Sequence, residues 1–373
     1  MVRVLQVVGR MDCGGLETLI MRLYRGMDRN KVQFDFLEYG EGRAYYDDEI
    51  EQMGGKIHRV VSKKQTPVRS ILETAKIMKQ YPIIHAHISS ANEYFNIFLA
   101  ELCGVKVRIA HSHSTSGLNN HLNTICRFFL SGTPTDYFAC SSAAAKWLFP
   151  GKIIKNREYA VFQNAIDILN FTYNPTVRKE VRNKLGLSHE FAVGNVGRFC
   201  RVKNHGFLID IFEKIHRIQP NSVLLLVGDG PLKKDIEEKV NRLGLSENVR
   251  FLGLRSDVPD LMQAMDAFVF PSLFEGLPIA LVEAQTAGLR CFVSDAVPRE
   301  VKITDSVQFI PLGNPAGDWA EKICGDGLSY ERQDSSAQIR AGGYEISAAA
   351  RKLQDFYLRH EKMLRGKGNE CVV

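Results

Sequence analysis

The chain has 373 residues, of which 45% are hydrophobic, and a mean hydropathy of −0.15. This length exceeds one ordinary hydrophobic core and fits two α/β domains. The net charge of +6 lies mostly in the first half, where residues 1–170 hold 21 basic and 16 acidic side chains. Because these basic residues are not interleaved with aromatic ones and no recognition module is readable, nucleic acid is excluded as an expected partner.

The first half reads as an alternation of short apolar runs and helix-period segments, which is typical of parallel strands joined by crossover helices. Strands are predicted at residues 3–8, 33–38, 56–60, 83–87, 106–111, 137–140 and 159–163. Helices are predicted between them, for example at 16–27 and 91–103. Residues 165–190 then become polar, so the first domain is predicted to span 1–170.

The second half repeats the alternation. Strands are predicted at 191–197, 222–227, 249–252, 267–271 and 291–294, with helices at 206–218, 232–243 and 258–264. A second domain at 171–345 is therefore expected, followed by an amphipathic helix at 346–364 that could pack back on the first domain, and a tail at 365–373. The predicted fold class is α/β, with two Rossmann-like, doubly wound parallel sheets facing a cleft and ligands at the carboxyl ends of strands.

Cysteine usage and the apolar runs bear on where the protein works. Eight cysteines without a Cys-x-x-Cys pair indicate neither a zinc site nor a disulfide framework, so a reducing compartment is expected. No apolar run approaches the roughly 18 residues of a membrane-spanning helix. Residues 1–9 read as a first strand and not as an export signal. A cytoplasmic protein is therefore predicted.

A basic segment in the first half qualifies that prediction. It surrounds a helix-like stretch and contains Lys56, Arg59, Lys63, Lys64, Arg69, Lys76 and Lys79. Such a face can rest on anionic lipid, which would place the protein peripherally at the inner face of the membrane. A solvated helix face is the alternative.

Two carboxylates in the second half, Glu275 and Glu283, are separated by seven residues. Gly276 and Pro278 break the backbone after Glu275, and Pro278 is predicted at the first position of a short helix that stops at Gly288. A helix N-terminus attracts an anionic ligand group, and carboxylates accept hydrogen bonds from hydroxyls, so the stretch predicts a donor-sugar site. An ordinary capping or surface role for Glu283 is the alternative.

A basic loop follows the first strand of the second half and contains Arg198, Arg201 and Lys203. Cations at the carboxyl end of a strand would neutralise charge that develops on a leaving diphosphate, and Arg198 and Lys203 are the candidates. A solvated loop is the alternative.

Two glycine turns follow predicted strands: Gly14–Gly15 after the first strand of the first half, and Gly228 with Gly230 after the second strand of the second half. Glycine allows the backbone to approach a ligand closely, and a helix start favours phosphate. The first pair lacks the further glycine of the dinucleotide fingerprint, and the chain has no Gly-x4-Gly-Lys-Ser/Thr loop. A plain tight turn is equally compatible with Gly14 and Gly15.

Two histidine pairs end predicted strands: His85 with His87, and His111 with His113. Alternate residues on a strand share a face, so either pair has the spacing to chelate a metal. No acidic or cysteine ligand is spaced to complete a set, and no Asp-x-Asp occurs, so no metal is expected. The first pair is interpreted as structural, and one histidine of the second pair as a polar contact to substrate.

Together these residues resemble the retaining glycosyltransferases of the GT-B fold, family 4, also called glycosyltransferase group 1. The resemblance covers most of the chain and rests mainly on Glu275-x7-Glu283 with Ala284 and Gly288. The segments 197–204 and 227–231 and the early Gly14–Gly15 support it. Residues 294–301 and the stretch after them are similar to a subgroup found in bacterial capsule and exopolysaccharide clusters.

The resemblance implies a role for each candidate residue. Arg198 and Lys203 would hold the donor diphosphate, Glu275 the donor sugar and Glu283 the nucleotide ribose. Gly276, Leu277 and Pro278 would bind sugar and phosphate through their backbone, and the turn at Gly253-Leu254-Arg255 would lie near the base. The family retains the anomeric configuration without a metal, so neither metal nor cofactor is expected beside the nucleotide sugar.

Two departures from the family pattern are visible. The usual Asn-Gly-Ile-Asp turn appears as Asn164-Ala165-Ile166-Asp167, which predicts a less tight turn. The single histidine usual on the catalytic side is doubled at His111 and His113, and the sequence does not select between them.

The resulting hypothesis is an enzyme that moves a hexose or N-acetylhexosamine from a UDP-sugar to a lipid-linked saccharide, with retention. A sugar phosphorylase and a non-catalytic nucleotide-sugar-binding protein are the alternatives, and a dinucleotide oxidoreductase is weaker because its fingerprint is missing. The acceptor is expected to be read by loops of the first domain.

Overall fold

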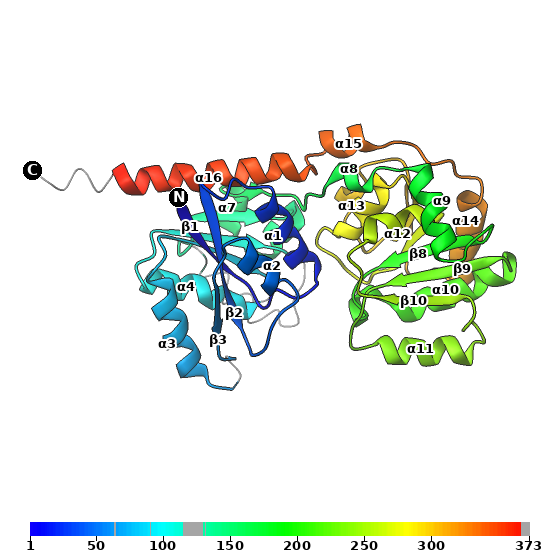
Figure 1. Cartoon of the computed structure of the whole chain (residues 1–373), viewed down its shortest axis with the longest axis horizontal. Helices are drawn as coiled ribbons and strands as arrows, with labels where there is room; N and C mark the ends of the chain where they lie inside the picture. The colour runs from blue at the N-terminus through cyan, green and yellow to red at the C-terminus, as the bar shows by residue number, and fades with distance from the viewer. Residues whose placement is uncertain (63–64, 90, 115–129, 131, 367–373) are drawn as a thin grey trace, which may run out of the picture. The chain divides into compact units, whose positions relative to one another are not determined.

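A computed structural model describes residues 1–62, 65–89, 91–114, 130 and 132–366 (Figure 1). It divides into unit 1, Met1–Ala165 together with the C-terminal helix, and unit 2, Ile166–Glu345. The division falls at Ala165 and not at the predicted residue 170. The reason is that the short helix α8 (Ile168–Phe171) buries Ile168 and Phe171 and packs on α12 (Val258–Ala264) and α13 (Ile279–Thr286) of unit 2.

The sheet of unit 1 consists of parallel strands in the order β3-β2-β1-β4-β5-β6-β7. In chain order these are β1 (Val2–Val7), β2 (Val32–Tyr39), β3 (Ile57–Val60), β4 (Ile83–Ile88), β5 (Val107–Ser112), β6 (Asp136–Ala139) and β7 (Ala160–Val161). Each lies where an apolar run predicted it. A strand covered on both faces is rich in Val, Ile and Leu, which makes such runs readable in the sequence.

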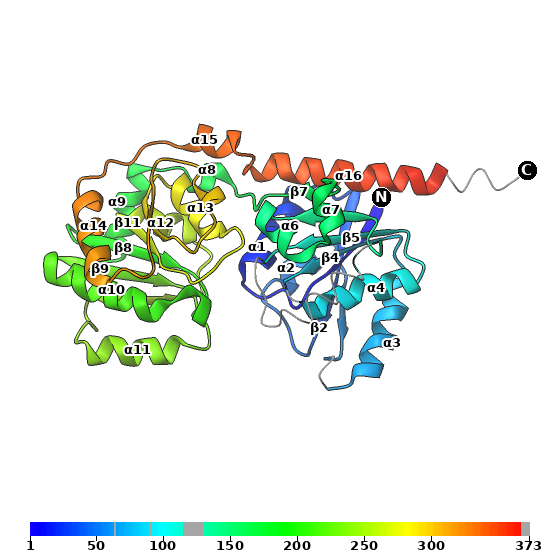
Figure 2. The same cartoon turned by 180° about the vertical axis from the view of Figure 1, so that it is seen from behind.

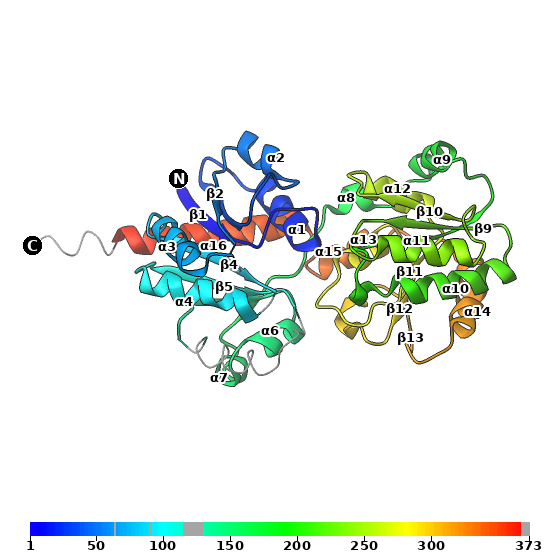
Figure 3. The same ribbon diagram turned by 90° about the horizontal axis from the view of Figure 1, so that it is seen from below.

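Helices lie on both faces of this sheet, with α1 and α2 on one side and α4 and α6 on the other (Figure 3). The helices of unit 1 are α1 (Gly15–Arg25), α2 (Asp47–Gln52), α3 (Pro67–Met78), η1 (Ala91–Tyr94), α4 (Phe95–Leu102), α6 (Ser142–Leu148), α7 (Gly151–Lys155) and α16 (Ile346–Gly366). The predicted helix at 91–103 is therefore a 3₁₀ turn that continues as an α-helix.

The C-terminal helix α16 lies along unit 1 and packs on α1, β1 and β2 (Figure 2). The ring centroid of its Phe356 lies 4.9 Å from that of Phe138 of β6. Leu353 and Tyr357 of α16 are buried in this contact. The structure thus places this helix on the first domain. It extends through Gly366, two residues beyond the predicted end, and the remainder of the predicted tail lies outside the described residues.

The sheet of unit 2 is also parallel, in the order β10-β9-β8-β11-β12-β13. Its strands are β8 (Phe191–Val196), β9 (Ser222–Val227), β10 (Val249–Gly253), β11 (Ala267–Phe270), β12 (Arg290–Ser294) and β13 (Val307–Ile310). The sequence did not predict β13, an edge strand whose two central residues are only partly buried and include the polar Gln308.

The helices of unit 2 complete a second doubly wound layer arrangement. They are α8, α9 (Pro175–Lys184), η2 (Arg201–Lys203), α10 (His205–Ile218), α11 (Lys233–Arg242), α12, α13, η3 (Arg299–Val301), α14 (Ala316–Gly327) and α15 (Ser336–Ala341). The core beneath α10 and α14 is built around Trp319, Phe212 and Phe292, all fully buried. No helix in the described part of the chain is long and apolar enough to cross a membrane.

Both sheets share one topology, because each has its third, second, first, fourth, fifth and sixth strands in that spatial order. The connections therefore change direction between β1 and β4 in unit 1 and between β8 and β11 in unit 2. In open α/β sheets, ligands bind at the carboxyl ends of the strands at this switch point. The loops after these four strands are where functional side chains are expected.

Candidate functional site

The loops after β8 and β11 bring Lys203 and Glu275 into direct contact. Lys203 Nζ donates to Glu275 Oε1 at 2.6 Å, and the two side chains are 20% and 12% exposed. The ammonium also lies 4.8 Å from the ring centroid of Phe270 at the end of β11. Charge-assisted hydrogen bonds in such partly buried positions are stronger than surface ones. Two residues predicted from separate motifs thus form one charged pair.

The backbone around this pair is held by a residue in the left-handed conformation. Asn204 has φ 55° and ψ 40°, and its amide Nδ2 donates to the carbonyl of Pro271 at 3.1 Å. The N–H of Leu273 donates to the carbonyl of Val202 at 2.8 Å. Asparagine tolerates this conformation better than most residues. The loops after β8 and β11 are therefore tied together at the switch point.

Arg198, the other predicted diphosphate ligand, is exposed in the same loop. Its guanidinium makes no hydrogen bond or ion pair within the part of the chain that the structure describes. Because Glu275 neutralises Lys203 whereas no described residue neutralises Arg198, Arg198 gives the loop a positive charge that can attract an anionic ligand.

The glycines after β9 have a structural reason of their own. Gly228 has φ 135°, and a Cβ there would lie 2.2 Å from the carbonyl oxygen of Gly197. A Cβ on Gly230 would lie 2.5 Å from the carbonyl oxygen of Phe199. Both glycines let the turn pack against the basic loop after β8. Ligand contact at these positions stays a prediction, because this packing alone requires glycine.

The two-carboxylate stretch forms helix α13, with one difference from prediction. Pro278 is the residue before the helix, which begins at Ile279 and not at Pro278. The helix ends as predicted, with Gly288 at φ 67°. Glu283 lies in the middle of α13 and is 5% exposed. It is therefore not the surface carboxylate of the alternative interpretation, whereas Glu275 precedes the helix in the partly exposed loop.

The turn predicted near the base begins at Gly253, which ends β10 with φ 71°. The guanidinium of Arg255 donates to both carboxylate oxygens of Asp257, at 2.7 and 2.5 Å. Both side chains are exposed. The Arg255 side chain is therefore already paired, in contrast to Arg198.

In unit 1, the first glycine pair starts helix α1. Gly14 is the N-cap residue and Gly15 the first residue of the helix. A Cβ on Gly14 would lie 2.2 Å from the Oε2 atom of Glu17 in the first turn. The positive end of α1 thus already faces a carboxylate, which competes with any external anion there.

The two histidine pairs, which the sequence presented separately, lie side by side because β4 and β5 are parallel neighbours with His87 opposite His111. His85 hydrogen-bonds to His111, Nε2 to Nδ1, at 3.0 Å, and His87 to His113, Nδ1 to Nε2, at 2.9 Å. The rings of His85 and His87 stack at a centroid distance of 4.4 Å, and those of His111 and His113 lie 4.0 Å apart, tilted by 36°. We call these four residues the histidine block.

The block is anchored at two points that sequence reasoning missed. Gln6 of β1 bonds to His87 at 2.9 Å, and the hydroxyl of Tyr357 on α16 bonds to His85 at 2.6 Å. The amphipathic pattern of α16 marked Tyr357 as a core position, but only the tertiary packing reveals its hydroxyl contact. His85 and His87 are thus buried, hydrogen-bonded structural residues, as predicted.

Burial keeps the block neutral. It lowers the pKa of His85 and of His113 to about 3, and it holds the pKa of His87 and of His111 well below the usual value, with the neighbouring histidines adding to the effect. Removing a charged imidazolium from water is costly, so the uncharged form dominates.

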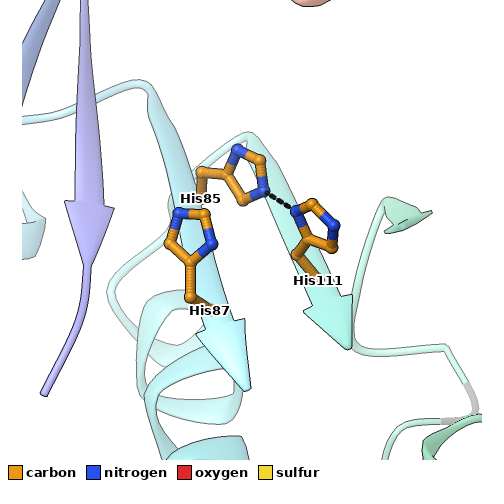
Figure 4. Close-up of side chains that lie close together, drawn as sticks. All are labelled: His85, His87 and His111. Atoms are coloured by element: carbon orange, nitrogen blue, oxygen red, sulfur yellow. Dashed lines mark hydrogen bonds between the residues drawn. The ribbon is translucent and has the colours of Figure 1, made fainter. Parts of the chain in front are cut away.

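Three of these residues, His85, His87 and His111, each offer a nitrogen within 4.8 Å of the others (Figure 4). Imidazole lone pairs lie in the ring plane, but the rings of His85 and His87 are stacked with an interplanar angle of 15°. The lone pairs of these two rings therefore lie in separate, nearly parallel planes and do not converge on one point. In this arrangement the rings form a hydrogen-bonded stack and not a chelate.

The block also bears on the choice between His111 and His113. His111 lies within β5 and is 3% exposed, whereas His113 follows the strand and is partly exposed. Of the two, only His113 is placed to meet a ligand without rearrangement.

Comparison with known proteins identifies the family. The model of the family "Glycosyl transferases group 1" matches residues 177–323. The putative glycosyltransferase EpsF of Bacillus subtilis is 37% identical over 333 residues, covering 86% of each chain. The chain belongs to the group 1 glycosyltransferases.

Other similarities agree with this assignment. The capsular polysaccharide biosynthesis glycosyltransferase CapH of Staphylococcus aureus is 26% identical over 295 residues, covering 76% of this chain and 79% of CapH. The crystal structure of Anabaena HepE in complex with UDP and glucose superposes with a TM-score of 0.77 at 18% identity, over 96% of this chain and 99% of HepE. The glycosyltransferase fold is GT-B, as the sequence resemblance implied, and the protein is an enzyme of the transferase class.

Proposed function

We propose that this glycosyltransferase moves a hexose or N-acetylhexosamine from a UDP-sugar to a lipid-linked saccharide during capsule or exopolysaccharide synthesis, with retention of configuration. The donor half of this proposal rests on the Lys203–Glu275 pair at the switch point of unit 2 and on Arg198 in the same loop, whose guanidinium pairs with no described residue. The proposed role in polysaccharide synthesis is supported by the similarity to CapH, which is named for capsular polysaccharide biosynthesis. An Escherichia coli relative is named as using UDP-Gal on a diphosphoundecaprenol-linked sugar, and is 28% identical over 242 residues.

The charged pair suggests how donor binding proceeds. In the ligand-free chain, Glu275 neutralises Lys203 at 2.6 Å. A diphosphate carries more charge than one carboxylate, so it would draw the Lys203 ammonium and the Arg198 guanidinium to itself. Glu275 would then be released to accept hydrogen bonds from sugar hydroxyls. Glu283 would contact the ribose, and backbone groups of Gly276, Leu277 and Pro278 the sugar and phosphate.

The chemical step follows from these roles. The bond between the anomeric carbon and the diphosphate oxygen breaks while the two cations neutralise the leaving group. The acceptor hydroxyl attacks from the same face, and the departing phosphate oxygen takes its proton. No protein base is required, and we expect transfer to continue in the presence of a chelator.

Contact with the membrane would bring the enzyme to a lipid-linked acceptor. On α3, Val68 and Leu72 are 71% and 65% exposed, and Lys76 lies one turn further along the helix. Two of the predicted basic residues are neutralised, because Arg59 pairs with Asp47 and Arg69 with Glu73. Lys63 and Lys64 lie outside the described residues. We propose that the remaining apolar and basic side chains of α3 rest on anionic lipid.

Vesicle sedimentation tests this contact. Binding to vesicles with phosphatidylglycerol should fall when Leu72→Ser is combined with Lys76→Glu, whereas Leu169→Ser, at a leucine of unit 2 that is 79% exposed, should leave it unchanged. Equal binding by all three proteins would contradict the proposal.

The donor is tested by thermal unfolding with a panel of nucleotides, since a ligand at a hundred times its Kd stabilises by about 2.7 kcal/mol. UDP should raise the Tm of the native protein selectively, and Lys203→Ala should lose most of that shift. Transfer is then followed as release of UDP from UDP-sugars, and the anomeric configuration of the product by NMR. No response to any nucleotide, or an inverted product, would refute the corresponding part of the proposal.

A further inference from the structure

Unit 1 has a pocket of about 380 Å³ that contains none of the residues of the candidate site. It lies between the amino ends of β6 and β7 and the helix α16, since Asp136 begins β6, Tyr159 precedes β7 and Phe356 belongs to α16. Its volume falls within the range of small-molecule sites, roughly 300–1,000 Å³. Because the candidate site lies at the carboxyl ends of strands, this pocket is a separate one.

The floor of the pocket is aromatic. The ring centroids of Phe138 and Phe162 are 4.6 Å apart, and those of Phe138 and Phe356 are 4.9 Å apart. Phe138 and Phe162 are buried, whereas Phe356 and Tyr159 are partly exposed. The Tyr159 hydroxyl makes no hydrogen bond to a residue that the structure describes. The floor therefore offers a ligand both apolar rings and a hydroxyl.

The rim of the pocket carries the basic side chains of Arg157, Lys352 and Arg359, all of them exposed. Lys352 Nζ lies 4.8 Å from the ring centroid of Phe162. Among the described residues, none forms an ion pair with these three side chains, and none forms a hydrogen bond with either guanidinium. Both arginines are therefore available to an external anion.

The two carboxylates in the wall are already engaged. Asp136 accepts a hydrogen bond from Thr135 Oγ1 at 2.8 Å and lies 3.4 Å from Nε2 of His360. Glu158 accepts a hydrogen bond from Asn156 Nδ2 at 2.8 Å. The charge that lacks a partner in this pocket is therefore positive, which favours an anionic ligand.

The backbone at Arg157 is an independent indication that its side chain is used. Arg157 follows Asn156, the C-cap residue of α7, and has φ 55°, in the left-handed region. The residue at the same place after α2, α4, α9, α11, α13 and α15 is glycine, with φ between 62° and 85°. Glycine is usual there because a Cβ is unfavourable in this conformation. Such strain persists mainly where the residue has a function.

We propose that this pocket binds a saccharide that carries a carboxylate or phosphate group. The planar guanidiniums of Arg157 and Arg359 match the geometry of either anion. The apolar face of a sugar ring packs on Phe356. Its hydroxyls meet the Tyr159 hydroxyl and the wall carboxylates, polar groups that the acyl chain of a lipid would desolvate without replacing their hydrogen bonds to water. The pocket belongs to unit 1 alone, so this inference does not depend on the proposed function.

Saturation-transfer NMR and calorimetry with the full chain measure this binding. The probes are glucuronic acid, glucose 1-phosphate and the uncharged glucose. Binding of either charged sugar, at least tenfold tighter than that of glucose, supports the proposal and identifies the anionic group. No detectable binding of either charged sugar, or equal binding of glucose, overturns it.

Arg359→Ala should raise the Kd of the charged sugar roughly tenfold, the effect of losing one charge-assisted hydrogen bond. The matched control is Arg351→Ala, because Arg351 is an exposed arginine of the same helix that does not line the pocket. This control should bind as the native protein does. Equal Kd values for the two variants would overturn the proposal.

Arg157→Gly separates binding from folding. Glycine adopts the left-handed conformation without strain, so this variant should raise the Tm by about 2 °C while the charged sugar binds roughly tenfold more weakly. A more stable variant that has lost binding cannot owe the loss to unfolding. Native affinity in Arg157→Gly would remove this side chain from the site.

Two further results would assign the ligand elsewhere. If UDP displaces the charged sugars, or if Lys203→Ala abolishes their binding, they occupy the donor site and the pocket proposal fails, whereas the proposed function is judged separately by the effect of UDP on the Tm. If the sugars do not bind but Arg359→Ala lowers sedimentation with phosphatidylglycerol vesicles, the pocket takes a lipid headgroup and the saccharide is refuted.

Discussion

The two units share one strand order but line the carboxyl edges of their sheets with different chemistry. Unit 1 places the neutral histidine block at the ends of β4 and β5, with three histidines buried within the strands and His113 just beyond β5. Unit 2 places a charged pair and an exposed arginine after β8 and β11. The topology thus decides where a site forms, and the side chains decide what it binds. Hydrogen-bonding neutral groups suit a saccharide, whereas cations suit a diphosphate.

The largest difference between the two units is expected in how their free energies of unfolding depend on pH. An unfolded histidine takes up a proton near its ordinary pKa of about 6.5, whereas the pKa of His85 and of His113 is lowered to about 3 by burial. Between these values the unfolded state binds more protons, so the free energy of unfolding falls as pH falls. Each histidine that stays neutral in the folded state contributes a loss of about 2 kcal/mol between pH 7 and pH 5.

Glu38, which also lies in unit 1, changes the free energy of unfolding in the opposite direction to the four histidines of the block. Burial and nearby Asp47 raise the pKa of Glu38 to about 7, so between pH 7 and pH 5 this residue takes up a proton in the folded state. The resulting gain in the free energy of unfolding is about as large as the loss caused by one histidine. The histidines with a lowered pKa outnumber this one carboxyl, so the free energy of unfolding of unit 1 should fall between pH 7 and pH 5 by more than that of unit 2. In unit 2, burial lowers the pKa of His205 to about 4, which predicts a loss of only about 2 kcal/mol.

The two tryptophans of the chain allow this difference to be measured, because Trp147 lies in unit 1 and Trp319 in unit 2. Urea unfolding followed by fluorescence in Trp319→Phe reports on unit 1, and in Trp147→Phe on unit 2. Each variant is compared with itself at the two pH values, so the cost of the substitution cancels. Equal pH dependence of the two units would contradict the prediction.

Breaking the charged pair should affect activity more than stability. Lys203→Ala or Glu275→Ala should lower transfer by about 10²–10³-fold, the usual cost of losing one electrostatic contact to the transition state. The matched control is Lys239→Ala, since Lys239 pairs with Asp210 at 2.6 Å in the same unit, between α11 and α10. Transfer near the native rate in either test variant, with native circular dichroism, would exclude the pair from the site.

The sequence predicted the fold well for a physical reason. Strands covered on both faces are continuous apolar runs, so β8 and β9 were readable, whereas β13, a partly exposed edge strand, was not. It also selected Lys203 and Glu275, because charged residues after buried strands are conspicuous. It could not show that these two residues pair.

Long-range contacts explain the other omissions. The histidine block requires β4 and β5 to be neighbours, and the contact of Tyr357 with His85 requires α16 to pack on unit 1. The hydrogen bond between His85 and Tyr357 joins residues 272 positions apart. Local patterns contain no information on such pairings. They also misplaced the unit boundary, because the contacts of α8 with α12 and α13 are tertiary.

Glycine substitutions extend the comparison to the turns of the two units. Gly228→Ala should destabilise unit 2 by about 3 kcal/mol, because the added Cβ meets a rigid carbonyl and φ is 135°. Gly14→Ala should cost less than about 1 kcal/mol in unit 1, since its Cβ meets only the flexible end of Glu17. Urea unfolding of each variant decides between these outcomes.

The control within unit 2 is Gly206→Ala. Gly206 lies in α10, and no heavy atom lies within 4 Å of a Cβ added there. Alanine is the better helix former, so this variant should be as stable as the native protein or more stable, by up to about 1 kcal/mol. Equal losses in all three variants would show that backbone approach does not explain the glycine at 228.

The smallest effect is expected at Arg255. Its guanidinium is paired with Asp257 on the surface, and exposed pairs contribute about 0–1 kcal/mol. A nucleotide would have to displace Asp257 to use this side chain, so we expect the backbone of the turn at Gly253 to contact the base. Arg255→Ala should then change the Kd of UDP less than about threefold, which corresponds to about 0.7 kcal/mol. Calorimetric titration measures this, with Arg198→Ala as the variant expected to weaken binding more. A tenfold loss in Arg255→Ala would show instead that the arginine leaves Asp257 to hold the nucleotide.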